Sequence, residues 1–439
     1  MLKCVHLFLL GCTSIFGCKG VGGRSADDCA SLTRQGRKGE EVFQIQTHVY
    51  RENIPQLLSR TDLEKLDRAV SATFHEVVFV IRQKNMGELT RILHDVSDPL
   101  SPNYGQHLTR EEVAALTSNP ESRDAVISYL SLKGASVVSE TLSGDYITAN
   151  APVAVWEEMF NTEFFTFHKT HLDQRVERVV RAEKYWVPIE LDMHVESVFN
   201  TIEMPVVLFG KLPKVVQHTD AHPTDKLTAS LIYPGVITPA QIRVFYNMSN
   251  SVTGSALSTQ AIYASNQQYF SPQDLLLFQV LLGLPVQPIY KQIGNATSDI
   301  ACYWDPEDCT EGNLDIQYIM GTSPISPTTF WYTDLQFSDW LVTVASSKNP
   351  PLIFSISYGE DERFSSVSQL AAFNTQAIKL GAMGVTIFVA SGDDGANSWF
   401  VNDYGAEFCG YAPSYPASNP YVTAIGATSV RLRYPVVSI

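Results

Sequence analysis

Two acidic residues in the segment E-G-N-L-D-I-Q-Y-I-M, Glu311 and Asp315, stand four positions apart. If this segment is helical, both side chains lie on one face of the helix, and Leu314, Ile316 and Ile319 can bury the neighbouring faces. Two carboxylates side by side repel each other, so the pair holds one proton over part of the acidic range and can serve as a tuned base. The alternative is a solvent-exposed acidic pair that favours the helix dipole.

A third carboxyl group belongs to Asp393, in the segment A-S-G-D-D-G that directly follows an apolar stretch. An aspartate at a strand end, beside glycines that let a substrate backbone approach, can donate a hydrogen bond to a developing oxyanion when it is protonated. That use requires acid pH. The alternative is an ordinary turn, because S-G and D-G are among the commonest turn dipeptides.

The elements that would position these groups predict an α/β fold for the region after Tyr233, where apolar strands alternate with helices. Segment 350–359 is typical of a buried strand, 367–381 of an amphipathic helix and 385–395 of the next strand. Together they predict a parallel sheet with a right-handed crossover. Ligands of such sheets collect at the carboxyl ends of the strands, where Ser357 and Asp393 fall.

The preceding region, from about 70 to 200, predicts an α+β module. It contains strand-like and helix-like stretches in the order 74–82, 86–96, 121–134, 135–151, 152–160 and 163–169. The third of these predicts a helix that Gly134 ends, and the fifth predicts a helix with Pro152 in its first turn. Segment 201–230 has scattered prolines and no sustained period, so we expect an exposed connector.

The composition is that of a folded protein. The chain has 439 residues, of which 45% are hydrophobic and 18% charged, enough for two or three domains. Its formal net charge of −15 would repel nucleic-acid phosphate and anionic lipid. After the N-terminal segment, no stretch offers the ~20 continuous apolar residues of a membrane span. We therefore expect neither nucleic-acid nor membrane partners.

The N-terminus indicates secretion. Residues 1–18 place Lys3 ahead of an apolar stretch that ends in small residues, which predicts a cleaved signal peptide. The alternatives are a short membrane anchor or a buried strand. Two sequons, Asn247-Met-Ser and Asn295-Ala-Thr, agree with the secretory pathway.

Few cysteines remain after that cleavage. Of seven, those left are Cys29, Cys302, Cys309 and Cys409. Cys302 and Cys309 stand close enough in the sequence for a local disulfide in an oxidising compartment, and Cys29 and Cys409 have no assigned partner.

The collinear order of the motifs resembles the sedolisin (serine-carboxyl peptidase) family, particularly its lysosomal tripeptidyl peptidase branch, over about 70–429. S-D-P-L-S-P-N-Y-G-Q-H-L-T (97–109) and Y-W-V-P (185–188) resemble elements of that family's activation propeptide. Segment 233–247 resembles the start of the mature enzyme, and 415–429 continues the similarity.

That resemblance implies a ferredoxin-like inhibitory prodomain ahead of a subtilisin-like parallel sheet. The implied organisation is a signal peptide (1–18), a prodomain (19–200, core about 70–200), a connector (201–230) and the N-terminal part of a peptidase domain (231–439).

Carried over residue by residue, the resemblance makes Glu311 the base that accepts the proton of a nucleophilic serine. Asp315 would orient and charge-couple Glu311, and Asp393 would be the oxyanion-hole acid. The implied reaction is acyl transfer at low pH, with tripeptides removed from free N-termini of peptides. Endopeptidase action is the near alternative. The implied location is the lysosome or the extracellular space.

Two expected parts have no match in these 439 residues: the serine of the family's S-G-T-S-x-S motif and the ligands of its calcium ion. Three interpretations stay open, namely a fragment, an alternatively spliced or misjoined product, or a true short form. As written, the chain is not expected to hydrolyse peptides by the family mechanism. A different class of function follows, a non-catalytic product whose prodomain binds or inhibits an intact sedolisin. The expected partners are otherwise peptide or unfolded protein substrates and the chain's own prodomain.

Overall fold

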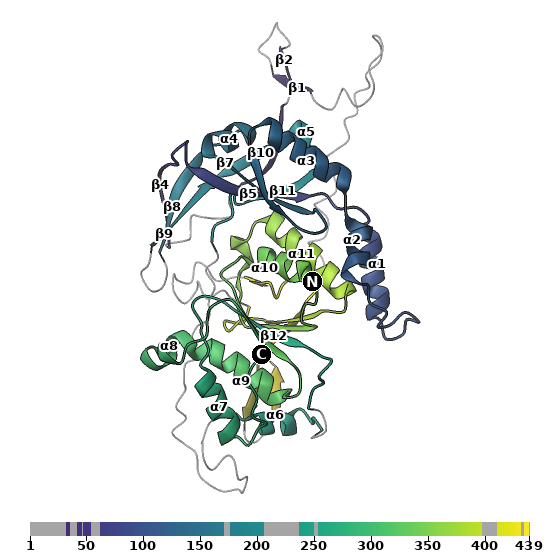
Figure 1. Ribbon diagram of the computed structural model, residues 1–439, viewed down its shortest axis with the longest axis vertical. Helices are drawn as coiled ribbons and strands as arrows, with labels where there is room; N and C mark the ends of the chain where they lie inside the picture. The colour runs from purple at the N-terminus through teal and green to yellow at the C-terminus, as the bar shows by residue number, and fades with distance from the viewer. Residues whose placement is uncertain are drawn as a thin grey trace, which may run out of the picture.

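The computed structural model describes residues 32–35, 42–45, 47–53, 62–170, 176–205, 237–249, 253–396, 411–431 and 434–438. The expected signal peptide, most of the expected connector, Cys29 and Cys409 lie outside these residues. We call the described residues 47–205 the N-terminal half and 237–438 the C-terminal half. Figure 1 shows the two halves stacked along the long axis of the molecule. Within the described residues, no helix has both the length and the apolar character needed to span a membrane.

The N-terminal half is built on a four-stranded antiparallel sheet with the order β11-β5-β7-β6. In chain order its strands are β5 (Phe74–Ile81), β6 (Ser136–Glu140), β7 (Tyr146–Pro152) and β11 (Val195–Phe199). Helices follow the first and the third of these strands, and the spatial order fourth-first-third-second is the split βαβ arrangement of ferredoxin-like folds. The ferredoxin-like α+β prediction is therefore confirmed.

The helices of this half agree with the sequence pattern except in one detail. They are α1 (Met86–Ser97), α2 (Arg110–Thr117), α3 (Pro120–Leu132), α4 (Val153–Met159) and α5 (Ile189–Asp192). Gly134 follows α3 at φ +76°, a backbone conformation that suits glycine. Pro152 was expected in the first turn of α4 but precedes the helix as its N-cap residue.

The other strands of this region form two antiparallel pairs and one three-stranded antiparallel sheet. The pairs are β1 (Leu32–Gln35) with β2 (Val42–Ile45) and β3 (His48–Asn53) with β10 (Lys184–Pro188), and the sheet has the order β4 (Leu63–Arg68), β8 (Phe164–Thr170), β9 (Val176–Ala182).

The C-terminal half contains a six-stranded parallel sheet with the order β13-β14-β12-β15-β17-β19. Its strands are β12 (Gln260–Ala264), β13 (Lys291–Ile293), β14 (Thr328–Tyr332), β15 (Ile353–Ile356), β17 (Thr386–Ala390) and β19 (Thr423–Ile425). The pairs β16 (Glu360–Asp361) with β18 (Ser414–Tyr415), and β20 (Thr428–Arg431) with β21 (Tyr434–Ser438), are antiparallel. The parallel α/β prediction is confirmed, including the adjacency of β15 and β17.

Strand β15 is shorter than the apolar run that predicted it. It begins at Ile353, after Pro350 and Pro351, which have no amide hydrogen to give to a neighbouring strand. It ends at Ile356, so Ser357, Tyr358 and Gly359 form the segment that leaves the sheet.

Helices cover both faces of this sheet (Figure 1). They are α6 (Pro239–Phe245), α7 (Pro272–Leu281), α8 (Asp299–Trp304), α9 (Thr310–Thr322), α10 (Phe337–Ser346) and α11 (Val367–Ala382), with short 3₁₀ turns η3 (Pro306–Cys309) and η4 (Glu362–Phe364). Side chains of β12 alternate between the two faces: Tyr263 packs with α10 and α11, and Ile262 packs with α7 and α9. The sheet is consequently buried on both sides.

The N-terminal half packs on the α10–α11 face of the C-terminal half. Leu89 and Leu93 of α1 and Val113 of α2 contact Ile378 and Ala382 of α11 in one buried cluster. At the start of α11, the Glu52 carboxylate of β3 accepts hydrogen bonds from the Val367 amide at 2.6 Å and the Ser368 hydroxyl at 2.7 Å.

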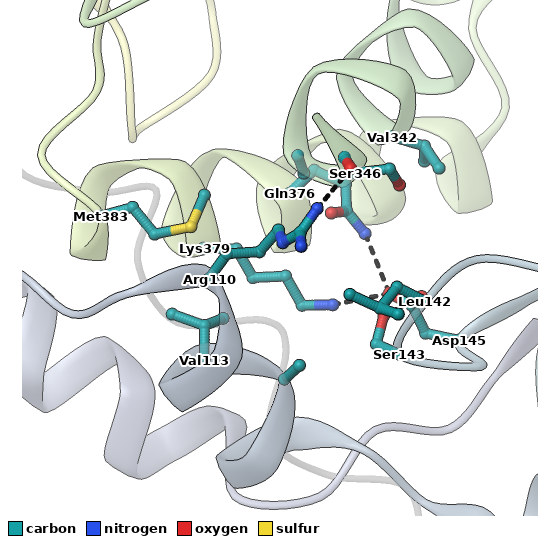
Figure 2. A pocket seen from close by; sticks show the side chains of 12 residues that line it. Arg110, Val113, Leu142, Ser143, Asp145, Val342, Ser346, Gln376, Lys379 and Met383 are labelled. Atoms are coloured by element: carbon teal, nitrogen blue, oxygen red, sulfur yellow. Dashed lines mark hydrogen bonds and ion pairs between the residues drawn. The ribbon is translucent and has the colours of Figure 1, made fainter. Parts of the chain in front are cut away.

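A buried ion pair crosses the same interface. The Lys379 ammonium of α11 lies 2.6 Å from Asp145 Oδ2 in the turn between β6 and β7, and the two side chains are 6% and 4% exposed. Figure 2 shows Lys379 and Gln376 both pointing at Asp145 beside a small cavity. Thr141 and Ser143 donate to the other oxygen of that carboxylate. Asp145 is thus buried with donors on both of its oxygens.

Candidate functional site

Helix α9 carries the predicted carboxyl pair, and its start is fixed by a disulfide. Cys302 and Cys309 are bonded, with Cα atoms 5.4 Å apart, and Cys309 is the last residue before the helix. This agrees with the local pairing that the sequence allowed. Of the apolar residues expected to bury this helix, Ile316 is fully buried, Ile319 is partly buried and Leu314 faces solvent.

A glycine lets the first turn of α9 approach the loop after β12. A Cβ atom added to Gly312 would lie 2.1 Å from the carbonyl oxygen of Tyr269, so this contact excludes any side chain. In the same loop, Gln268 accepts a hydrogen bond from the Glu311 amide at 3.0 Å and donates one to the Glu307 carbonyl at 3.0 Å. The backbone of Glu311 is therefore held by contacts with β12's exit loop.

Asp315, one turn further along α9, points toward the end of β15. Its Oδ1 accepts a hydrogen bond from the Ser357 hydroxyl at 2.7 Å, and its Oδ2 is buried without a partner. Burial raises the pKa of Asp315 well above its usual range, and the charge of Glu311 raises it further. A protonated Oδ2 can donate across to Glu311, which would satisfy the buried atom.

Glu311 is a partly buried carboxyl with a raised pKa. Burial is the main cause, a hydrogen bond with Ser357 opposes it, and the charge of Asp393 adds to it. The pair thus differs from the alternative in which both acids are solvated residues at a helix N-terminus.

Asp393 lies three residues beyond β17, exposed, in the loop that leaves the carboxyl end of that strand. Gly392 before it has φ +94°, in the left-handed region that favours glycine. Since β15 and β17 are parallel neighbours, Ser357 and Asp393 leave the sheet at the same end. The structure brings all three predicted carboxyl groups to this end of the sheet.

Sequence reasoning missed two contributors to the site, Ser357 and Gln268. The sequence pattern places Ser357 at a strand end, within a segment, 355–359, that resembles a substrate-cleft strand of the family, without predicting its contact with the carboxyl pair. Its contact with Asp315 spans 42 positions in the chain, and nothing local indicates it. Buried Tyr358 was also unassigned, and its ring lies 5.6 Å from that of Tyr263.

We searched the described residues for clusters of side chains that could bind a metal ion. Among the described residues, no group of three or more histidine, cysteine, aspartate or glutamate side chains is arranged to hold one. No step below uses the calcium that the family resemblance implies.

Comparison with known proteins finds relatives of both halves. Residues 61–204 match the family model "Pro-kumamolisin, activation domain". Tripeptidyl-peptidase 1 of Mus musculus is 30% identical over 376 residues, which cover 81% of this chain and 61% of that protein. The protein of the same name from Homo sapiens is 29% identical over 373 residues, covering 80% and 61%. The chain thus spans less than two thirds of the length of these relatives.

Among solved structures, Pseudomonas sedolisin, a serine-carboxyl proteinase complexed with pseudo-iodotyrostatin, matches with a TM-score of 0.35 and 23% identity over 44% of this chain and 54% of that chain. The chain is thus similar to an activation domain in its N-terminal half and to tripeptidyl-peptidase 1 across both halves.

Proposed function

We propose that the chain is the proenzyme form of an acid-acting serine-carboxyl peptidase that removes tripeptides from free N-termini. The observation that carries this proposal is the gathering of Glu311, Asp315 and Asp393 at one end of the parallel sheet, with the first two sharing raised pKa values. The tripeptidyl specificity rests on relatives that bear the name tripeptidyl-peptidase 1.

In this mechanism, ionised Glu311 accepts the proton of a seryl hydroxyl as that oxygen attacks a peptide carbonyl. Asp315 keeps its proton, donates to Glu311 and so orients it. Asp393, when protonated, donates to the oxyanion that forms on the carbonyl carbon's oxygen. The attacking serine is not among the residues that the resemblance assigns in this chain, so these three side chains account for proton transfer and charge stabilisation only.

The working pH follows from the roles of the two outer groups. Activity rises with pH as Glu311 ionises. Because burial raises the pKa of Glu311, this rise occurs at a higher pH than for a solvent-exposed glutamate. The mechanism also requires a protonated carboxyl group at Asp393, so we expect activity to be confined to the acidic range.

The N-terminal half would act as the intramolecular inhibitor of that peptidase. Supporting this, it matches an activation domain and buries the Asp145–Lys379 pair against α11. A second candidate function, inhibition of an intact sedolisin in trans, is favoured by one observation. The half has a hydrophobic core of its own, with Phe79, Trp156 and Phe160 at its centre.

The secretory pathway is the proposed location, with the lysosome or the extracellular space as destination. The Cys302–Cys309 disulfide is typical of an oxidising compartment. Asn247 and Asn295, the acceptors of the two sequons, are exposed in loops, as glycosylation requires.

The test is release of tripeptides by the purified chain from a peptide with a free N-terminus, followed by mass spectrometry from pH 3 to pH 7. An N-acetylated copy of the peptide separates tripeptidyl from endopeptidase cleavage. Release that follows the proposed mechanism is expected to fall by about 10²–10⁴-fold in E311Q, the usual contribution of a general base. The matched control is E307Q, which removes an exposed glutamate just before α9.

Turnover that survives in E311Q would overturn the mechanism. If the chain releases no product at any pH but slows a purified tripeptidyl-peptidase 1 in the same assay, the inhibitor function replaces the peptidase function.

A further inference from the structure

Ser357 occupies a position between the two carboxyl groups that no part of the proposed mechanism uses. It follows directly after β15 and is half-buried, and its hydroxyl donates to Asp315 Oδ1 at 2.7 Å. The same hydroxyl is within hydrogen-bonding range of Glu311. One side chain from the sheet thus reaches both acids on α9.

A seryl hydroxyl has a single hydrogen to donate. It can therefore stabilise the negative charge of only one of the two carboxyl groups at a time. Donation to Glu311 favours an ionised Glu311 and a proton on Asp315, the state that the mechanism uses, whereas donation to Asp315 favours the reverse. Other donors are scarce around the pair, since Asp315 Oδ2 is buried without a hydrogen bond.

We infer that Ser357 is a positioning residue of the carboxyl pair, whose hydroxyl fixes the two side chains relative to the sheet and determines which of them carries the shared proton. The inference rests on the proposed function, since it concerns how the proposed base is kept ready to accept a proton. It adds a residue from the sheet to a unit that otherwise lies wholly on α9.

The other groups that face the pair come from the same end of the sheet. Asp393, after β17, acts on Glu311 through its charge and disfavours ionisation. Burial, and then the charges of Asp315 and Glu311, raise the pKa of the Tyr358 phenol. Of these neighbours, Ser357 is the one that donates to Asp315.

Removal of the Ser357 hydroxyl withdraws the one donor that stabilises the first ionised acid of the pair, so the pair loses its first proton less readily. We expect S357A to raise the lower of the two protonation midpoints by about one pH unit, a tenfold change in proton affinity for a hydrogen bond to a charged group. S357T keeps the hydroxyl and should leave both midpoints in place.

The measurement is pH-difference infrared spectroscopy on the whole chain, which follows the carbonyl stretch of protonated carboxylic acids. E311Q and D315N assign the bands. The matched control is S355A, which removes a half-buried hydroxyl two residues earlier on the same strand. S357C, a nearly isosteric replacement with a weak donor, should give an intermediate shift and carries the test if S357A does not fold.

Midpoints that stay unchanged in S357A or S357C, or that move equally in S355A, would overturn the assignment. Labelling of Ser357 by a fluorophosphonate would also overturn it, because the hydroxyl would then be a nucleophile. The titration does not depend on peptide release, so the inference and the proposed function can fail separately.

Discussion

Two aspartates, Asp145 at the interface of the two halves and Asp315 on α9, are both removed from solvent, yet the pKa of Asp145 is lowered and that of Asp315 is raised. Burial pushes the pKa of Asp145 up, but the Lys379 charge and hydrogen bonds from Lys379, Ser143 and Thr141 pull it below its usual value. Burial raises the pKa of Asp315, and the charge of Glu311 raises it further. The one hydrogen bond from Ser357 lowers this pKa but does not offset the rise.

The difference shows what partners do to a buried acid. With a cation and donors on both oxygens, the carboxylate stays ionised and joins two surfaces. With a second acid and one donor, it keeps a proton that it can exchange. The same side chain thus holds the halves together in one place and prepares proton transfer in the other.

The largest expected effect comes from removing the cation of the interface pair. K379M should weaken the interface by about 3–5 kcal/mol at pH 7, because it leaves Asp145 buried beside no positive charge. Amide hydrogen exchange of α11 and of the β6–β7 turn measures this loss. The double variant D145L/K379M should recover most of it. A control, R110M, removes a cation that reaches the Ser346 carbonyl from the same interface. K379M exchange rates equal to those of R110M would contradict the comparison.

His75, a basic side chain without an acidic partner, extends the comparison of the two aspartates. His75 Nε2 donates to the Asn200 carbonyl oxygen at 2.7 Å, and burial, with a smaller contribution from the Arg181 charge, lowers the pKa of His75 to about 4. The unfolded chain therefore binds this proton first, and stability falls as pH drops from about 6.5 toward 4.

We expect H75Q to remove roughly 2–3 kcal/mol of that acid-dependent loss. Urea unfolding of the chain at pH 7, 5.5 and 4 measures it, and H94Q at an exposed position is the control. An identical pH dependence in H75Q and the unmodified chain would show that His75 does not cause the loss.

The smallest effect should come from making Asp315 permanently neutral. Because its folded pKa is raised, the chain loses stability as pH rises through the range between the unfolded and folded values. D315N should therefore stabilise the chain at pH 7 by about 1–2 kcal/mol, the cost of a buried unsatisfied group, with little gain at pH 4. Urea midpoints at both pH values test this, with the exposed D274N as control. A loss of stability of equal size at both pH values would refute it.

Much of the fold could be predicted because its signals are local. The capping box of α11, in which Ser366 and Gln369 exchange hydrogen bonds, and the apolar run of β17 are visible within a few residues. The carboxyl pair was visible for the same reason, since four residues are one helical turn.

The contacts that complete the site and the interface could not be predicted. Ser357 meets Asp315 across 42 positions, and Lys379 meets Asp145 across 234. Such pairs depend on the packing of α9 against the sheet and of the β6–β7 turn against α11. The sequence pattern fixes neither, because apolar faces tolerate many relative placements.

The packing of the N-terminal half on α10 and α11 has a consequence for how the chain is made. Residues 62–205 leave the ribosome before those two helices, and N-terminal domains generally fold first during synthesis. The ferredoxin-like unit can then be folded when α11 emerges. Glu52 can accept hydrogen bonds from the first turn of α11, and Asp145 can pair with the Lys379 ammonium group. The apolar face of α11 would then pack on the folded N-terminal half as it is synthesised and would not be left exposed to water.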